Sequence, residues 1–144
     1  MNKLGLAIKI AASAFLMKTD KAGKPYILHC LRVMHKLHSD DEELNTIAVL
    51  HDLLEDVSEL WSVDSLRTRG FSERVLQALL ILTHKKGQTY EDYIKVVATN
   101  SDAVKVKLAD LRDNSNITRL KGLRKKDFDR IEKYHKAYVY LSDL

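Results

Sequence analysis

One stretch of the sequence combines an apolar helical pattern with side chains that could bind a metal ion. In AVLHDLLEDVSEL, residues 48–60, four titratable side chains fall within six positions: His51, Asp52, Glu55 and Asp56. Residues three and four apart share one face of a helix, so a single surface would present an imidazole and three carboxylates. Neighbouring acids raise one another's pKa values unless a cation is present. A divalent metal ion would relieve that repulsion.

Two residues far from this stretch complete a candidate ligand set. His29 lies in a second apolar helical segment, and Asp110 lies in KLADLRDN. Together with His51 and Asp52 they form a set of imidazoles and carboxylates without thiolate. Such a set is typical of Mn²⁺, Fe²⁺ or similar ions that keep open positions for water. It differs from the closed, cysteine-rich sites of structural zinc.

Each candidate residue also has an ordinary structural alternative. A lone histidine such as His29 in an apolar helix is more often a hydrogen-bonded core residue. Asp110 could simply pair with Lys107 or Arg112, a contact of small energetic value at a surface. Glu55 and Asp56 could be solvated charges at a helix end, although acids are unfavourable near a helix C-terminus. All of these alternatives would have to hold together, which favours the metal site.

The elements that must position these residues are expected to be helices throughout. Apolar residues recur at helical spacing along the chain, and five glycines and one proline leave little room for a turn-rich β architecture. VKVKLAD alternates like a strand but would have no partner, so we assign it to a helix. The expected helices cover about 2–17, 25–38, 41–60, 63–69, 73–84, 90–99, 102–117 and 128–144. The sequence therefore predicts one compact all-α domain over residues 1–144, with about seven or eight helices.

Capping residues mark where several of these helices begin. A side-chain oxygen placed just before a helix accepts a hydrogen bond from a backbone N–H of the first turn. The expected caps are Asp40 or Asp41, Ser72, Thr89, Ser101 and Asp127. Asp92 follows Thr89 by three residues, as in a capping box.

Composition and charge restrict the classes of partner. The 144 residues carry a net charge of +4, which suits a phosphate-bearing ligand but does not by itself indicate nucleic-acid binding. The basic cluster at 119–130 is expected to be a solvated face. Cys30 is the one cysteine, which excludes an internal disulfide and fits a reducing compartment. No segment is long enough to span a membrane, so we expect a cytoplasmic protein of undetermined oligomeric state.

Three ordered segments resemble a known family. GKPYILHCLRV, HDLLEDV and VKLADLRDN, between residues 23 and 114, are similar to the family patterns GEPYIxHPxxVA, HDxxEDT and VKLADRLHN. Their histidine, histidine–aspartate doublet and distant aspartate form the signature of the HD superfamily of metal-dependent phosphohydrolases. The three segments together resemble the hydrolase domain of the RelA/SpoT family and its stand-alone small alarmone hydrolases.

The resemblance implies an activity and a role for each matched residue. The metal, usually Mn²⁺ and alternatively Fe²⁺, Mg²⁺ or Co²⁺, would be held by His29, His51, Asp52 and Asp110. Glu55 and Asp56 match residues that activate or orient the attacking water, and Asn114 matches a substrate contact. The implied reaction removes the 3′-pyrophosphate from guanosine tetra- or pentaphosphate. Independently of the family, the lysines expected to neutralise phosphate are Lys21, Lys24, Lys85 and Lys86.

The resemblance is weakest in the loop that precedes the first segment. FLMKTDKAGKPY stands where the family has a pattern like HxGQxRKSGEPY, and Asp20 aligns with the arginine that packs on the guanine base. Phosphohydrolase chemistry is therefore expected, but guanosine specificity does not follow. Two alternatives are an HD phosphatase for another nucleotide, such as a dNTP, dNMP or NADPH, and a catalytically silent nucleotide-binding module. The complete ligand set with Glu55 and Asp56 argues against the silent module.

Overall fold

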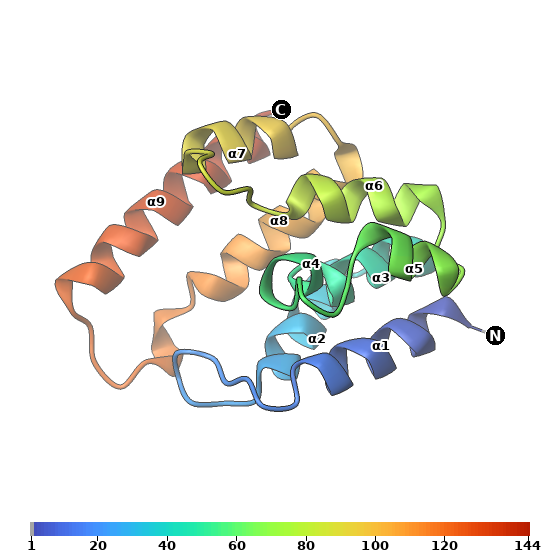
Figure 1. The fold of residues 1–144 in the computed structure, drawn as a ribbon. Helices are drawn as coiled ribbons and strands as arrows, with labels where there is room; N and C mark the ends of the chain where they lie inside the picture. Colours follow the sequence, from blue (N-terminus) through green and yellow to red (C-terminus); the bar gives the residue numbers. More distant parts are fainter. Residues whose placement is uncertain (1) are drawn as a thin grey trace.

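The computed structural model describes residues 2–144 as a bundle of helices (Figure 1). In this range there is no β-strand, only an isolated bridge between Thr19 and Pro25. The helices are α1 Lys3–Ala14, α2 Tyr26–Lys36, α3 Glu42–Leu50, α4 Leu53–Asp56, α5 Val63–Thr68, α6 Glu73–Leu82, α7 Tyr90–Val97, α8 Ser101–Asn114, the 3₁₀ helix η1 Ile117–Arg119, and α9 Lys125–Ser142. The predicted all-α, single-domain fold is confirmed, residue 1 of the predicted domain lying outside the described residues.

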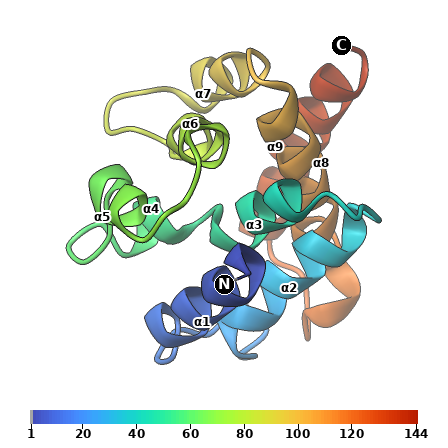
Figure 2. The ribbon, with the colours of Figure 1, turned by 90° about the vertical axis from the view of Figure 1, so that its right-hand side faces the viewer.

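Helix α3 lies at the centre of the bundle. Thr46 is 1% exposed, and residues 47–50 are all 0% exposed. A helix that is covered on every side must be apolar around its whole circumference, as this stretch is. Helices α1, α2, α6 and α8 pack around it (Figure 2). Helix α3 therefore ends in the interior of the protein, at Leu50.

Helix α8 connects this centre to the C-terminal helix. It packs against α2, α3 and α6 on one side and against α7 and α9 on the other (Figure 1). The strand-like pattern VKVKLAD lies within it, so its assignment to a helix is confirmed. Asp110 and Asp113 on α8 are 4% and 1% exposed. Buried carboxylates are costly unless they are paired or bind metal, so α8 brings polar chemistry into the core.

Three of the predicted helix caps are confirmed. The side chain of Asp41 accepts a hydrogen bond from Leu44 N at the start of α3. Ser72 and Thr89 do the same at the starts of α6 and α7. These contacts satisfy backbone N–H groups that have no partner within the helix.

Two predicted caps are wrong. Asn100, and not Ser101, caps α8, because its side chain accepts from Ala103 N and Ser101 is already in the first turn. Asp127 lies within the first turn of α9, where its carboxylate accepts from Arg124 N at 2.8 Å. A carboxylate in the first turn can reach back to the N-cap backbone, so Asp127 still stabilises this helix end.

The predicted third helix is divided where its titratable residues begin. Helix α3 ends at Leu50, α4 starts at Leu53, and His51 and Asp52 form the turn between them. Here His51 N bonds to Ala48 O, three residues back instead of four. The expectation that four titratable side chains share one continuous helix surface is therefore wrong. The turn directs His51 and Asp52 to one place, and α4 carries Glu55 and Asp56 separately.

None of the helices between residues 2 and 144 is both long enough and apolar enough to cross a lipid bilayer.

Candidate metal centre

Four side chains from three distant segments meet at one point in the interior. His29 comes from α2, His51 and Asp52 from the turn between α3 and α4, and Asp110 from α8, and one ligand atom of each lies within 4.8 Å of the others. Asp110 Oδ1 is 3.0 Å from His29 Nε2 and 3.2 Å from His51 Nε2. Asp52 Oδ2 is 3.1 Å from His51 Nε2. The structure thus brings together all four residues of the predicted ligand set.

The donor atoms of this cluster fit a divalent ion. His29 Nε2 is buried without a hydrogen-bond partner, since its contact with Asp110 lacks hydrogen-bonding geometry. A buried polar atom without a partner needs an explanation, and an ion is one. Ligand atoms bound to one ion at about 2.1 Å lie roughly 3 to 4.3 Å apart, and the cluster is only slightly wider. The cluster could hold a metal ion of the kind that accepts imidazole and carboxylate together.

The pKa values of the cluster show how its charges balance without a cation. Burial by itself lowers the pKa of both histidines, but the carboxylates of Asp110 and Asp113 raise that of His29. Asp52 and Asp110 raise the pKa of His51 well above its usual range. Burial opposes ionisation of Asp52, yet the neighbouring His51 holds its pKa down at about 2. The carboxylates of the cluster therefore favour positive charge at this point, which protonated imidazoles or a divalent cation would supply.

Both histidines are oriented through their Nδ1 atoms. His29 Nδ1 lies 2.7 Å from Asp113 Oδ2, and His51 Nδ1 lies 2.6 Å from the carbonyl oxygen of Ala48. Both partners are acceptors, so each Nδ1 carries the proton and donates it. The Nε2 atoms are left facing the cluster, which is the usual arrangement around metal-binding histidines.

The two carboxylates have supporting partners of their own. Tyr26 on α2 donates a hydrogen bond from its hydroxyl to Asp52 Oδ2. Lys107 Nζ lies 2.9 Å from Asp110 Oδ2, and Asn114 Nδ2 donates to Asp110 Oδ1 over 3.0 Å. The alternative pairing of Asp110 with Lys107 thus exists alongside the cluster. Lys107 holds one carboxylate oxygen while the other oxygen faces the histidines.

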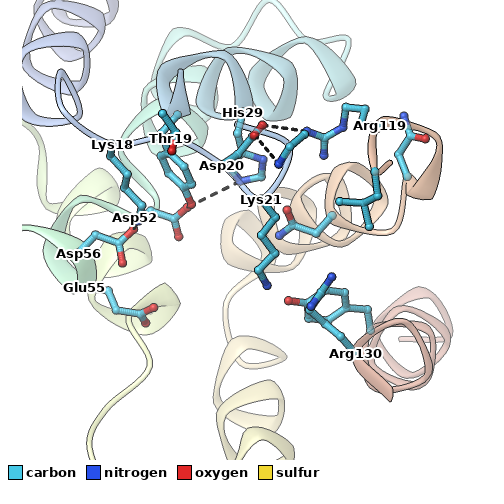
Figure 3. Close-up of a pocket in the computed structure, with 16 residues that line it drawn as sticks. Lys18, Thr19, Asp20, Lys21, His29, Asp52, Glu55, Asp56, Arg119 and Arg130 are labelled. Atoms are coloured by element: carbon cyan, nitrogen blue, oxygen red, sulfur yellow. Dashed lines mark hydrogen bonds and ion pairs between the residues drawn. The ribbon is translucent and has the colours of Figure 1, made fainter. Parts of the chain in front are cut away.

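A cavity of about 380 Å³ opens next to the cluster (Figure 3). Its acidic wall consists of Asp52, Glu55 and Asp56. Opposite this wall, its basic and polar lining comes from the loop before α2, from the segment after α8 and from α9. The side chains of that lining include Lys21, Asn114, Asn116, Arg119, Arg130 and Tyr134.

Glu55 and Asp56 both face the cavity, but their surroundings differ. Glu55 Oε1 accepts a hydrogen bond from His84 N at 2.7 Å, and burial together with the nearby acids raises the pKa of Glu55. Asp56 is ion-paired with Lys18 at 2.6 Å, and burial raises the pKa of Asp56 as well. A raised pKa brings a carboxylate closer to the range in which a general base works at neutral pH. Glu55, which forms no ion pair among residues 2–144, is the better placed of the two for that role.

The predicted substrate-binding residues divide into two groups. Asn114 and Lys21 line the cavity, and Lys21 extends between the acidic wall and Arg130 (Figure 3). Lys24, Lys85 and Lys86 do not line it. Lys24 is exposed and follows Gly23, whose φ of 80° marks a turn after Lys21. Lys85 and Lys86 belong to the loop between α6 and α7, where both are exposed.

Several residues of this site were missed in the sequence. Lys18, Tyr26 and Asp113 contact the acids and a histidine of the centre, and each comes close to it only through the fold. Arg119 and Arg130 line the cavity, so the expectation that cluster 119–130 is only a solvated face is wrong for these two. The position of Asp113, one turn after Asp110, was the one available signal, because both would lie on the same side of a helix.

Comparison with known proteins did not identify a family. The sequence matches no model of a known protein family, and a search of curated proteins found no significant match.

Proposed function

We propose that this protein is a metal-dependent phosphohydrolase of the HD type that acts on a nucleotide. The preferred substrate class is a guanosine 3′,5′-bis(diphosphate)-like nucleotide, cleaved with release of pyrophosphate. One observation carries the proposal: two histidines and two aspartates from three distant segments meet beside a cavity with acidic and basic walls. The resemblance of the three sequence segments to the HD superfamily supports it.

His29, His51, Asp52 and Asp110 would hold the ion, with Mn²⁺ as the first candidate and Fe²⁺, Mg²⁺ or Co²⁺ as alternatives. Two neutral imidazoles and two carboxylates leave a divalent ion with no net charge to repel an anionic substrate. When bound, such an ion lowers the pKa of water and polarises a phosphoryl oxygen. Tyr26, Lys107 and Asp113 contact three of the four ligands, which are Asp52, Asp110 and His29 respectively.

Glu55 is proposed to accept the proton of the attacking water. The water oxygen forms a bond to phosphorus and its proton passes to Glu55, while the bond from phosphorus to the nucleoside oxygen breaks and that oxygen takes up a proton to leave as a hydroxyl. Its raised pKa makes it a stronger base than an ordinary glutamate. Asp56, already bound to Lys18, is proposed to position that lysine and the water beside the cluster.

The basic wall of the cavity is proposed to bind the remaining phosphate charge. Burial and the nearby cations Arg130 and Lys133 lower the pKa of Lys21, although Asp127 opposes this effect and is ion-paired with Arg130 at 2.7 Å. Crowded cations repel one another, so an anion between them is favoured. Tyr134 and Tyr26 add aromatic surface to the same cavity.

The nucleotide base is the least constrained part of the proposal. Asp20 stands at the position of the family's base-packing arginine, so this position carries a carboxylate instead of a cation. Its carboxylate accepts from Ala22 N and Lys24 N at 2.9 Å each and lies 3.0 Å from Arg119 Nη1. Because this position does not supply a cation for guanine, the second candidate substrate is another nucleotide, such as a dNTP, a dNMP or NADPH. The complete ligand set speaks against a silent nucleotide-binding module, and no nucleic-acid partner is proposed.

A substrate panel tests the proposal. The purified protein would be supplied with Mn²⁺ and given guanosine tetra- and pentaphosphate, dNTPs, dNMPs and NADPH, with pyrophosphate and orthophosphate release measured separately. Turnover that disappears in His51→Ala is the expected result. Mn²⁺ binding without turnover of any nucleotide would indicate the silent module. A strong preference for guanine over other bases would contradict the hypothesis that Asp20, in place of an arginine, weakens guanine recognition.

A further inference from the structure

Asp113 is a second buried carboxylate on α8, outside the four candidate ligands. It is 1% exposed, and its Oδ2 lies 2.7 Å from His29 Nδ1. Its Oδ1 lies 2.8 Å from Arg32 Nε and 3.4 Å from Lys36 Nζ. Asp113 is therefore a carboxylate that keeps its charge in the interior.

The charge of Asp113 is supported from the side of the cavity as well. Arg119 Nη2 donates to the carbonyl oxygen of Asp113 at 3.0 Å and lies 3.6 Å from its Oδ2. The same guanidinium reaches Asp20 through Nη1, 3.0 Å away (Figure 3). Arg32 and Arg119 thus lie between the carboxylates of Asp113 and Asp20. Both oxygens of Asp113 have cationic partners, so its position beside His29 is fixed from several directions.

This geometry determines which nitrogen of His29 carries a proton. An ionised carboxylate only accepts hydrogen bonds, so the Nδ1 atom of His29 must donate. In the neutral imidazole the other nitrogen, Nε2, is then a free electron pair. That atom is the buried one without a hydrogen-bond partner, and it faces Asp52 and Asp110. The orientation is the one that metal ligation through Nε2 requires.

We propose that Asp113 is a positioning residue that holds His29 in the Nδ1–H tautomer with Nε2 directed into the cluster. Its importance for metal binding rests on the proposed function, whereas the tautomer is a property of the metal-free protein. The corresponding partner of His51 is the uncharged carbonyl of Ala48. His29 is thus the histidine whose orientation depends on a side chain and can be tested by substitution.

Asp113→Asn is the test variant, because it keeps the shape of the side chain and removes its charge. An amide can donate as well as accept, so His29 is no longer restricted to one tautomer. Asp102→Asn is the matched control. Asp102 is also on α8 and is also held by an arginine, Arg74 at 2.9 Å, but it belongs to a different ion network. Asp113→Glu adds a variant that keeps the charge.

Two measurements on these variants decide the proposal. In ¹⁵N spectra of the metal-free protein above the pKa of His29, assigned with a His29→Gln variant, we expect Nδ1–H in the native protein and a mixture in Asp113→Asn. Mn²⁺ affinity, measured by calorimetry, should fall roughly 10- to 100-fold in Asp113→Asn, recover in part in Asp113→Glu, and stay near native in Asp102→Asn.

The outcome that overturns the positioning role is equally definite. It is an Asp113→Asn protein that retains the native tautomer and binds Mn²⁺ as Asp102→Asn does. Failure of the proposed function looks different: the native protein would bind no Mn²⁺ through His51, while its tautomer spectrum would still report on Asp113. The two failures can therefore be distinguished.

Discussion

Lys107 and Asp110 form a buried ion pair one turn apart on α8, with Lys107 Nζ 2.9 Å from Asp110 Oδ2. The lysine side chain is only 12% exposed, and its ammonium lies 5.1 Å from the centre of the Tyr93 ring. Burial opposes the charge of Lys107, but Asp110 raises its pKa well above its usual range. The pair places a permanent positive charge directly behind a candidate metal ligand.

Removing this charge should destabilise the metal-free protein more than the metal-bound protein. Lys107→Met leaves a buried carboxylate without its partner, which we expect to lower the free energy of unfolding by about 3 kcal/mol. Mn²⁺ should reduce that loss, because it supplies positive charge to Asp110. Urea unfolding with chelator and with Mn²⁺ measures both values. Lys105→Met, an exposed neighbour on α8, is the control. Equal losses of unfolding free energy with chelator and with Mn²⁺ would show that Lys107 does not influence the metal centre.

The ligand set itself predicts a joint loss of metal binding and activity. His51 is 4% exposed and lies within hydrogen-bonding distance of Asp52 and Asp110, so no other side chain can take its place. His51→Ala and Asp52→Ala should each abolish Mn²⁺ binding by calorimetry and turnover of the preferred nucleotide. His135→Ala, at an exposed position on α9, should leave both unchanged. Full turnover in either ligand variant would exclude this site.

The raised histidine pKa values predict a specific pH dependence. Folded-state pKa values above the unfolded value of 6.5 mean that the histidines stabilise the metal-free fold fully below that pH. This stabilisation is lost as pH rises through the folded-state values. Metal binding requires deprotonated imidazoles, so Mn²⁺ must displace their protons. Affinity and the Mn²⁺-induced rise in Tm should therefore be larger at about pH 8.5 than at about pH 6.

Proton release provides the direct check on this pH dependence. Calorimetric titrations in buffers of different ionisation enthalpy report the protons displaced by each Mn²⁺. We expect net release near pH 7 in the native protein and less release in His29→Gln, which lacks one of the two basic sites. Binding without any proton release at this pH would show that the imidazoles are already neutral in the metal-free protein.

Glu55 should affect the rate without affecting the metal. Its carboxylate lines the cavity but is not among the four ligands, so Glu55→Gln should bind Mn²⁺ normally. Loss of the proton acceptor should lower kcat by about 10²- to 10⁴-fold. Glu59→Gln, exposed just beyond α4, is the matched control. A native kcat in Glu55→Gln would leave Glu55 with only its hydrogen bond to His84 N, a structural role.

The four residues of the candidate cluster could be chosen from the sequence because their types stand out in apolar helical segments and because three segments resemble a known family. The turn at His51 and Asp52 could not be predicted, because a continuous helix explains the same apolar pattern. It arises where α3 ends inside the packed core. The contacts of Tyr26 and Asp113 with the cluster could not be predicted, for a different reason. Their partners, Asp52 and His29, are distant in sequence, and a single tyrosine or aspartate has many ordinary roles. These supporting contacts depend on the packing of α2 against α8, which the sequence does not show directly.

Two lysines that are close in sequence differ in their relation to the cavity, which makes them a matched pair. Lys21 lines the cavity between the acidic wall and Arg130, whereas Lys24 does not line it. Lys21→Met should raise KM for a phosphorylated substrate roughly tenfold, because a charged hydrogen bond to phosphate is lost, while kcat changes little. Lys24→Met removes the same charge and should leave KM near native. Equal changes in the two variants would mean that net charge alone, and not a contact from Lys21, attracts the substrate. Unequal changes in the expected direction would locate phosphate binding between Lys21 and α9, on the side of the cavity opposite Glu55.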